Sequence, residues 1–221
     1  MIRFENVSKS FPIRGGHRVI VDRLNLTIPR GRSVGLIGRN GAGKTTLLRM
    51  ISGSLDPDRG RIVRHARISW PLGFAGGFHG ALTGAQNVRF AARIYGVDTD
   101  ALLAYVEEFA ELGPFLHEPV ATYSSGMRAR LAFGVSMGVH FDFYLVDEVT
   151  AVGDEIFKRK CEAVFNDRLV ESDVIMVSHS MATLRTYCQS GIVLENGVAT
   201  YCEDLEEAIE IHMRNMRTLD D

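Results

Sequence analysis

Apolar residues recur at alternate positions near the start of the chain, which is the spacing of a half-buried β-strand. Residues 18–28 show this spacing most clearly, and residues 2–7 show it in part. The apolar positions are Val19, Val21, Leu24, Leu26 and Ile28 in the longer segment and Ile2, Phe4 and Val7 in the shorter one. The pattern predicts two antiparallel strands at the N-terminus.

A strand, a loop and a helix are expected next. Residues 33–37 form a short apolar run that is typical of a buried strand. A glycine-rich loop follows, and then a helix that begins at Thr45. Gly53 ends this helix, because glycine readily adopts the left-handed conformation found after helix C-termini.

The apolar spacing becomes helical over residues 83–138. Thr83 can cap a helix that ends at Gly96, and residues 98–100 can cap a second helix that ends at Gly113. We therefore expect a helical insertion in this part of the chain.

Strands and helices alternate after the insertion, which is the order of a parallel sheet with helices on both faces. The alternating segments are strand 142–146, helix 154–170, strand 174–177 and helix 180–188. A hairpin over residues 192–201 and an acidic helix from about Asp204 follow. The predicted fold class is α/β, with a mostly parallel sheet, an N-terminal antiparallel β subdomain and an inserted helical subdomain. The single domain, residues 1–221, divides into a sheet-containing part, residues 1–82 and 139–221, and a helical part, residues 83–138.

The composition is that of an ordinary globular protein and excludes several function classes. Of the 221 residues, 46% are apolar, and 25 basic residues nearly balance 27 acidic ones. A net charge of −2 gives no overall attraction to nucleic acid or to an anionic membrane. Cys161, Cys188 and Cys202 fit neither a disulfide framework nor a zinc pattern, which indicates a reducing compartment.

One uncharged segment has the length of a membrane span but not the composition. Residues 68–88 are 21 residues without Asp, Glu, Lys or Arg. Five glycines together with Pro71, His79 and Asn87 make the segment too polar and too poor in helix formers for a lipid-facing helix. The charged residues at the start of the chain likewise predict no export signal.

Residues 38–45, Gly-Arg-Asn-Gly-Ala-Gly-Lys-Thr, match the pattern G-x-x-x-x-G-K-[ST] and lie between the expected strand and helix. Glycines allow backbone N–H groups to surround phosphates, and a helix N-terminus adds positive potential. Lys44 would reach the β- and γ-phosphates, and the Thr45 hydroxyl would bind Mg²⁺. A glycine turn with an exposed lysine is the competing interpretation. The motif in its context favours phosphate binding.

Two adjacent carboxylates, Asp147 and Glu148, follow an apolar strand, at the end where open α/β sheets bind ligands. Asp147 would hold Mg²⁺ through water, and Glu148 would act as a base on the attacking water. A solvated acidic turn is the alternative. His179 follows the next strand, where an imidazole can hydrogen-bond a γ-phosphate, and a structural histidine is the alternative.

A further motif distinguishes among families that contain the phosphate loop. Residues 123–133, Tyr-Ser-Ser-Gly-Met-Arg-Ala-Arg-Leu-Ala-Phe, open a helix before Asp147. Two serines and a glycine at a helix N-terminus form an anion site, whereas a serine-capped helix is the alternative. Taken in order with the phosphate loop, Asp147–Glu148, residues 151–154 and His179, this segment resembles the signature loop of ATP-binding-cassette (ABC) ATPases.

Within that superfamily, the chain is similar to the ATP-binding subunits of bacterial capsular polysaccharide exporters, over residues 68–84, 123–133 and 146–154. The resemblance implies ATP and Mg²⁺ as ligands. It also implies two copies that face head to tail, so that each signature loop closes on the nucleotide bound by its partner. Further implied partners are an integral membrane permease and other envelope export components, with no nucleic acid. The implied location is peripheral, on the cytoplasmic side of the inner membrane.

Motifs and resemblance together indicate the site residues. Glu148 and His179 are assigned as catalytic, and Thr45 and Asp147 as metal ligands. The nucleotide-contacting residues are Phe11, Gly38, Arg39, Asn40, Gly41, Ala42, Gly43, Lys44, Thr45, Thr46, Ser124, Ser125 and Gly126. By the resemblance, Phe11 stands where an aromatic ring stacks on adenine, and a core phenylalanine is the alternative.

The chain departs from the family pattern at two places. Ser125 and Met127 replace the usual glycine and glutamine of the signature loop. No glutamine occurs between Arg64 and Gly84, where cassette ATPases carry one that senses the metal. His79 is the residue we expect to replace it.

Residues 70–81 are predicted to contact the membrane partner. Trp70, Phe74 and Phe78 lie there among glycines with no charge nearby, and packing against the helical insertion is the alternative. Two other assignments stay open for the whole chain. One is the ATPase of an exporter of O-antigen or teichoic acid, although such ATPases often carry an added C-terminal domain. The other is a soluble cassette ATPase, although these usually join two cassettes or carry basic patches.

Overall fold

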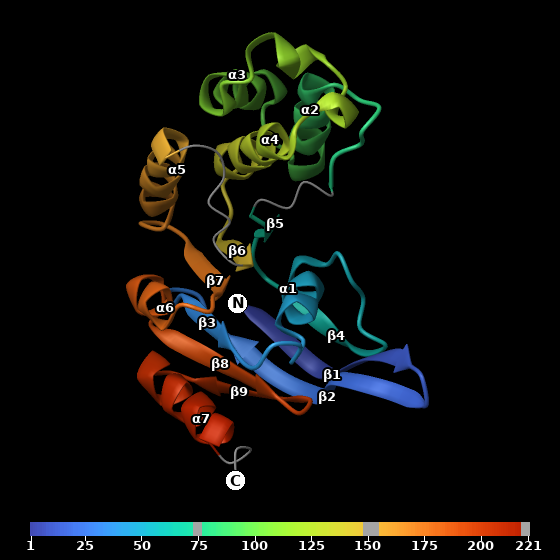
Figure 1. Cartoon of the computed structure of the whole chain (residues 1–221), viewed down its shortest axis with the longest axis vertical. Coiled ribbons are helices and arrows are strands. Elements are labelled where there is room, and N and C mark those ends of the chain that lie inside the picture. Colours follow the sequence, from blue (N-terminus) through green and yellow to red (C-terminus); the bar gives the residue numbers. More distant parts are fainter. Residues whose placement is uncertain (73–76, 148–154, 218–221) are drawn as a thin grey trace. The chain divides into compact units, whose positions relative to one another are not determined.

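The computed structural model describes residues 1–72, 77–147 and 155–217. These residues form two compact units, whose elements are labelled in Figure 1. The sheet-containing unit consists of residues 1–71, 141–147 and 172–217. The helical unit consists of residues 72, 77–140 and 155–171.

An antiparallel sheet contains the N-terminus and has three strands in the described ranges, in the order β2-β1-β4 (Figure 1). The strands are β1 (Ile2–Ile13), β2 (Gly16–Ile28) and β4 (Arg59–Arg64). Ile2 lies opposite Ile28 and Phe4 opposite Leu26, so the apolar alternation in the sequence produces one apolar face. The predicted antiparallel strands at the N-terminus are confirmed.

The second sheet has six strands within the described part of the chain, in the order β5-β6-β7-β3-β8-β9. Neighbouring strands are parallel except for β8 and β9, which form a C-terminal hairpin. The strands are β3 (Val34–Ile37), β5 (Ile68–Pro71), β6 (Phe143–Asp147), β7 (Asp173–Val177), β8 (Ser190–Glu195) and β9 (Val198–Cys202). The predicted mostly parallel sheet is confirmed.

Helices cover β3 from both sides. Leu47 of α1 (Lys44–Ser52) joins Leu36 in a buried cluster that also includes Ile2 and Phe4 of the first sheet. On the other side, Gly35 lies against α6 (Met181–Tyr187) and α7 (Leu205–Arg217), where an added Cβ would be 3.1 Å from the Leu205 side chain. All of β3 is therefore buried, as its continuous apolar sequence requires.

The helical unit begins with a capped helix. The Thr83 hydroxyl accepts a hydrogen bond from the Gln86 N–H, and the Gln86 side chain accepts one from the Thr83 N–H. The helices of the unit are α2 (Gly84–Tyr95), α3 (Thr99–Ala110), α4 (Ser125–Gly138) and α5 (Glu155–Arg168), with 3₁₀ turns η2 (Gly113–His117) and η3 (Val120–Thr122). The predicted helix over 101–112 ends earlier, because Glu111 takes φ +52°. None of the helices in the described ranges is long and apolar enough to cross a bilayer.

Helix α5 packs with the other helices of this unit. The Phe157 ring contacts the Phe109 ring edge-on, with centroids 5.5 Å apart, and the Arg130 guanidinium lies 4.2 Å from the Phe157 centroid. Residues 155–171 belong to the helical unit, whereas the division made from the sequence places residues 139–221 with the sheets. The packing of α5 joins residues that are far apart in sequence, which a local sequence pattern does not reveal.

Candidate active site

The loop between β3 and α1 requires glycine at three positions. Gly41 and Gly43 have φ values of +79° and +108°, which L side chains rarely adopt. An added Cβ at Gly38 would collide with the carbonyl oxygen of Leu194, and one at Gly43 would collide with the Ile20 side chain. Only glycine therefore allows the loop to lie this close to β2 and β8, and its N–H groups and the α1 N-terminus favour an anion.

Lys44 is anchored by the loop that precedes it. Its Nζ donates hydrogen bonds to the carbonyl oxygens of Gly38, at 2.6 Å, and Arg39, at 3.0 Å. Only 8% of the residue is exposed. Because the ammonium is already oriented, little side-chain freedom remains to be lost when a ligand binds.

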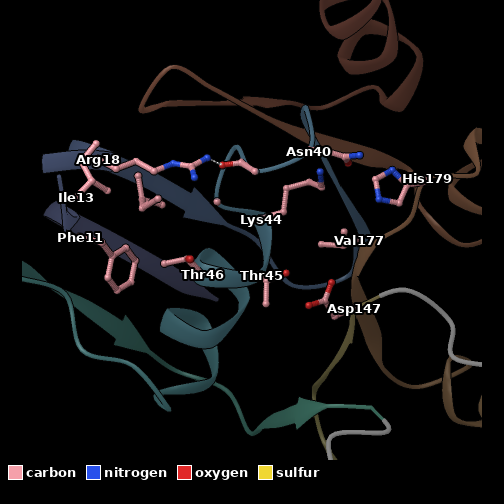
Figure 2. Close-up of a pocket in the computed structure, with 13 residues that line it drawn as sticks. Phe11, Ile13, Arg18, Asn40, Lys44, Thr45, Thr46, Asp147, Val177 and His179 are labelled. Atoms are coloured by element: carbon pink, nitrogen blue, oxygen red, sulfur yellow. Dashed lines mark hydrogen bonds between the residues drawn. The ribbon is translucent and has the colours of Figure 1, made fainter. Parts of the chain in front are cut away.

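The loop borders a cleft of about 640 Å³, shown in Figure 2. Leu36 and Asp147 each lie opposite Val177 in the parallel pairing, and His179 follows β7. The carboxyl ends of β3, β6 and β7 therefore meet at this cleft. The residues that line it are Phe11, Ile13, Arg18, Ile20, Asn40, Gly41, Gly43, Lys44, Thr45, Thr46, Asp147, Val177 and His179. The fold thus brings together most of the site residues indicated by the sequence.

Thr45 and Asp147 bring oxygen donors to the cleft from different elements. Thr45 is in the first turn of α1, and Asp147 ends β6 (Figure 2). A hydroxyl and a carboxylate are the hard oxygen ligands that Mg²⁺ prefers, and this ion usually takes its remaining ligands from phosphates and water. The donor set therefore fits magnesium. Glu148, the expected general base, lies outside the described residues.

Phe11 lies at the β1–β2 hairpin and lines the same cleft. Its exposed fraction of 38% shows that it is not a core residue. The Lys9 ammonium lies 5.4 Å from the ring centroid and forms an ion pair with Asp58 at 2.7 Å. An exposed aromatic ring inside a cleft can stack on a planar base.

Arg18 also lines the cleft, although no motif in the sequence marks it. It lies opposite Phe11 in the β1–β2 pairing. Its guanidinium donates a hydrogen bond to the carbonyl oxygen of Gly41, drawn as a dashed line in Figure 2. Only the spatial approach of β2 to the loop reveals this residue.

Comparison with known proteins identifies the family. The sequence model described as ABC transporter matches residues 21–151, which is more than half of the chain. The chain belongs to the ABC transporter family. It is 50% identical to the polysialic acid transport ATP-binding protein KpsT of Escherichia coli, over 95% of each chain. It is 48% identical to the capsule polysaccharide export ATP-binding protein CtrD of Neisseria meningitidis serogroup B, over 96% of this chain and 98% of that one.

The fold is also that of a solved ABC ATP-binding cassette. The structure is described as a dimeric post-hydrolysis state of the cassette MJ0796 bound to ADP and Pi. The match has a TM-score of 0.73 and 20% identity, and it covers 93% of this chain and 99% of the other. The family and the P-loop fold predicted from the sequence are confirmed.

The residues predicted to form the signature motif open α4. The Ser124 hydroxyl accepts a hydrogen bond from the Met127 N–H at 3.2 Å and caps the helix. Ser124 and Ser125 are exposed, and Gly126 is half-buried. These three residues belong to the helical unit and are not among the described residues that line the cleft.

Backbone hydrogen bonds join the segment before α2 to the segment before Ser124. The Ala121 N–H donates to the Gly80 carbonyl oxygen, and the Val120 N–H donates to the Leu82 carbonyl oxygen, both at 2.9 Å. The two segments form one hydrogen-bonded piece, which we call the clip, residues 80–84 and 118–123.

His79 lies beside the clip in the helical unit. Its N–H donates to the Asn87 side-chain oxygen at 2.8 Å, and its carbonyl oxygen accepts from the Asn87 side-chain nitrogen at 3.2 Å. His79 is not among the described residues that line the cleft. Its replacement of the missing glutamine stays a prediction.

The aromatic residues of segment 70–81 have different surroundings. Trp70 packs edge-on against Phe141, with ring centroids 5.9 Å apart, so its own unit covers part of it. Phe78 is half-buried. Phe74 lies outside the described residues.

Proposed function

We propose that this chain is the ATP-hydrolysing, energy-coupling subunit of an exporter of capsular polysaccharide. The observation that carries the proposal is the nearly full-length identity of 50% and 48% to proteins named for polysialic acid transport and capsule polysaccharide export. The cleft provides chemistry that supports it, because a glycine-lined phosphate loop, a lysine and a carboxylate meet there.

Each cleft residue would have a separate role in ATP hydrolysis that follows from its position. The loop N–H groups and Lys44 would bind the β- and γ-phosphates, and His179 would donate a hydrogen bond to a γ-phosphate oxygen. Thr45 and Asp147 would hold Mg²⁺, which when bound neutralises charge on phosphate oxygens. Water would attack the γ-phosphorus and lose its proton to Glu148, while the bond to the β–γ bridging oxygen breaks to release ADP.

Two copies would face head to tail to complete each site. Ser124, Ser125 and Gly126 stand at the N-terminus of a 14-residue helix, where N–H groups and the helix dipole favour an anion. The two serines are exposed, which leaves them accessible to nucleotide bound by the partner. The structural relative is itself a dimer bound to ADP and Pi, which supports this assembly.

The ATPase dimer would act as a peripheral subunit on the cytoplasmic side of the inner membrane. Its partners would be an integral permease and further envelope export components, as the export role of the relatives supports. A nearly neutral net charge supports the assignment of no nucleic-acid partner. Segment 70–81, with Phe78 in its second half, would contact the permease.

Deletion of the gene in the source bacterium, followed by complementation, tests the proposal. The unchanged gene should restore capsule at the cell surface, and Lys44→Ala should fail to do so although the protein accumulates normally. Loss of O-antigen or teichoic acid with intact capsule would show that the substrate is wrong. Recovery of the chain from the cytosol alone, rather than from salt-washed membranes, would favour a soluble cassette ATPase.

A further inference from the structure

We propose that Arg18 is a further contact for the phosphate chain of the nucleotide, in addition to Lys44. The inference rests on the proposed function, because it requires ATP in the cleft. Arg18 lies on β2 and lines the cleft, and its Nη2 donates a hydrogen bond to the Gly41 carbonyl oxygen. Its guanidinium is therefore at the loop whose N–H groups favour phosphate.

Arg18 and Lys44 approach this loop from different elements. Lys44 reaches it from α1, and Arg18 reaches it from β2, as Figure 2 shows. An added Cβ at Gly41 would lie 2.7 Å from Arg18 Nη2 and 3.7 Å from its Cζ, so the guanidinium is in close contact with the loop. Because Arg18, Gly41 and Lys44 all line one cleft, a phosphate chain bound there would be bordered by two cations.

The charge of Arg18 is available for an anion. In the part of the chain that the structure describes, no carboxylate forms an ion pair with it, and its hydrogen-bond acceptor is an uncharged carbonyl oxygen. A guanidinium has five N–H donors in a planar fork that suits phosphate oxygens. A charge-assisted hydrogen bond to phosphate is stronger than a bond to a neutral carbonyl.

The pairing of the hairpin indicates which part of the nucleotide Arg18 would meet. Phe11, the proposed base-stacking residue, lies opposite Arg18 on β1. The Arg18 side chain extends from that position to Gly41, which places the guanidinium at the phosphate end of the cleft (Figure 2). Arg18 is therefore expected to contact phosphates and not the base.

Calorimetric titration of ATP and of adenosine into three variants tests the inference. Arg18→Gln removes the charge, Arg18→Lys keeps it, and Arg14→Gln removes an exposed charge from the turn of the same hairpin as a control. For Arg18→Gln, we expect the ATP dissociation constant to rise about ten- to hundredfold, with adenosine binding unchanged. Arg18→Lys should lose less ATP affinity, and Arg14→Gln should match the unchanged protein.

Several results would overturn the inference. One is unchanged ATP affinity in Arg18→Gln, and another is an equal loss for ATP and adenosine, which would indicate a contact to the base or ribose. If Arg18→Gln does not fold, the Arg18→Lys variant tests the inference by itself. An equal loss of affinity for ATP and for adenosine in that variant would again exclude a phosphate contact. Failure of the unchanged protein to bind ATP would instead reject the proposed function, so the two failures are distinguishable.

Discussion

The Lys44 ammonium donates a hydrogen bond of 2.6 Å to the Gly38 carbonyl oxygen, so the end of the loop is anchored to its beginning. A side chain without the ammonium would remove this anchor together with the charge that meets phosphate.

We expect Lys44→Ala to lose measurable ATP binding, because the variant lacks the cation at the phosphate loop. Arg49→Ala removes an exposed cation from the same helix and should bind ATP normally. Isothermal titration with both variants checks the expectation, and circular dichroism checks that both are folded. Normal ATP affinity in Lys44→Ala would contradict the assignment of the loop.

We expect Glu148→Gln to bind ATP but to hydrolyse it roughly 10²–10⁴-fold more slowly, because an amide cannot accept the proton of the attacking water. The variant should accumulate as an ATP-bound dimer in size-exclusion chromatography with Mg²⁺. Glu155→Gln, at an exposed position of α5, is the matched control and should turn over normally. A Glu148→Gln protein that stays monomeric and hydrolyses at the normal rate would reject Glu148 as the base.

A mixed dimer tests whether the signature residues act on the partner's nucleotide. In a dimer of one Gly126→Asp subunit and one Lys44→Ala subunit, a head-to-tail arrangement puts both lesions in one composite site and leaves the other intact. Purified with two different tags, this dimer should keep up to about half of the normal ATPase rate if single sites turn over. Activity no higher than that of either homodimeric variant would count against the arrangement.

Phe78→Asp tests the contact between segment 70–81 and the permease. Because Phe78 is only half-buried, we expect ATP affinity and thermal midpoint of the isolated subunit to stay close to normal. Membrane recruitment and capsule export should be lost, because burial of an unpaired carboxylate in an apolar interface is energetically unfavourable. Phe115→Asp changes an exposed aromatic of η2 and serves as the control. Unfolding of Phe78→Asp would instead place Phe78 in the core, and normal export would exclude the contact.

His212 on α7 should make the fold less stable in acid. It is 9% exposed, and burial lowers the pKa of His212, with Lys44 and Arg39 acting in the same direction and Glu195 opposing them. The unfolded chain therefore takes up this proton first, near the ordinary histidine pKa of about 6.5. The stability contribution is complete above that pH and declines as the pH falls below it.

Substitution of His212 by glutamine should remove this part of the acid sensitivity. We expect the thermal midpoint of His212→Gln to fall less than that of the unchanged protein between about pH 7.5 and about pH 5.5. His65→Gln changes an exposed histidine and should behave like the unchanged protein. Identical pH profiles for His212→Gln and the unchanged protein would exclude the effect.

Local signals in the sequence predicted the elements that have clear ends. Gly53 ends α1, and Thr83 caps α2 through a side-chain exchange with Gln86, so both boundaries are chemical and local. Strand β4 carried no such signal, because most of its residues are charged or exposed and only Ile62 is buried. It becomes a strand through antiparallel pairing with β1, which is a tertiary effect.

The residues of the candidate site also divide into those that local sequence signals mark and those that only the tertiary structure reveals. Gly38–Thr45 could be found from its motif. Asp147 and His179 could be found because Asp147 ends one apolar strand of a parallel sheet and His179 follows another. Arg18 could not be found, because its place depends on the register of a hairpin and on how closely that hairpin approaches the loop.

The clip has a mechanical consequence for the signature serines. Its hydrogen bonds connect the stretch just after Phe78 to the stretch just before Ser124, two stretches that are about 40 residues apart in the chain. Because backbone hydrogen bonds stretch very little, we expect a pull on one stretch to displace the other by a similar amount. A movement of segment 70–81 against the permease would then be transmitted through the clip to the signature serines, and from them to the nucleotide of the partner subunit.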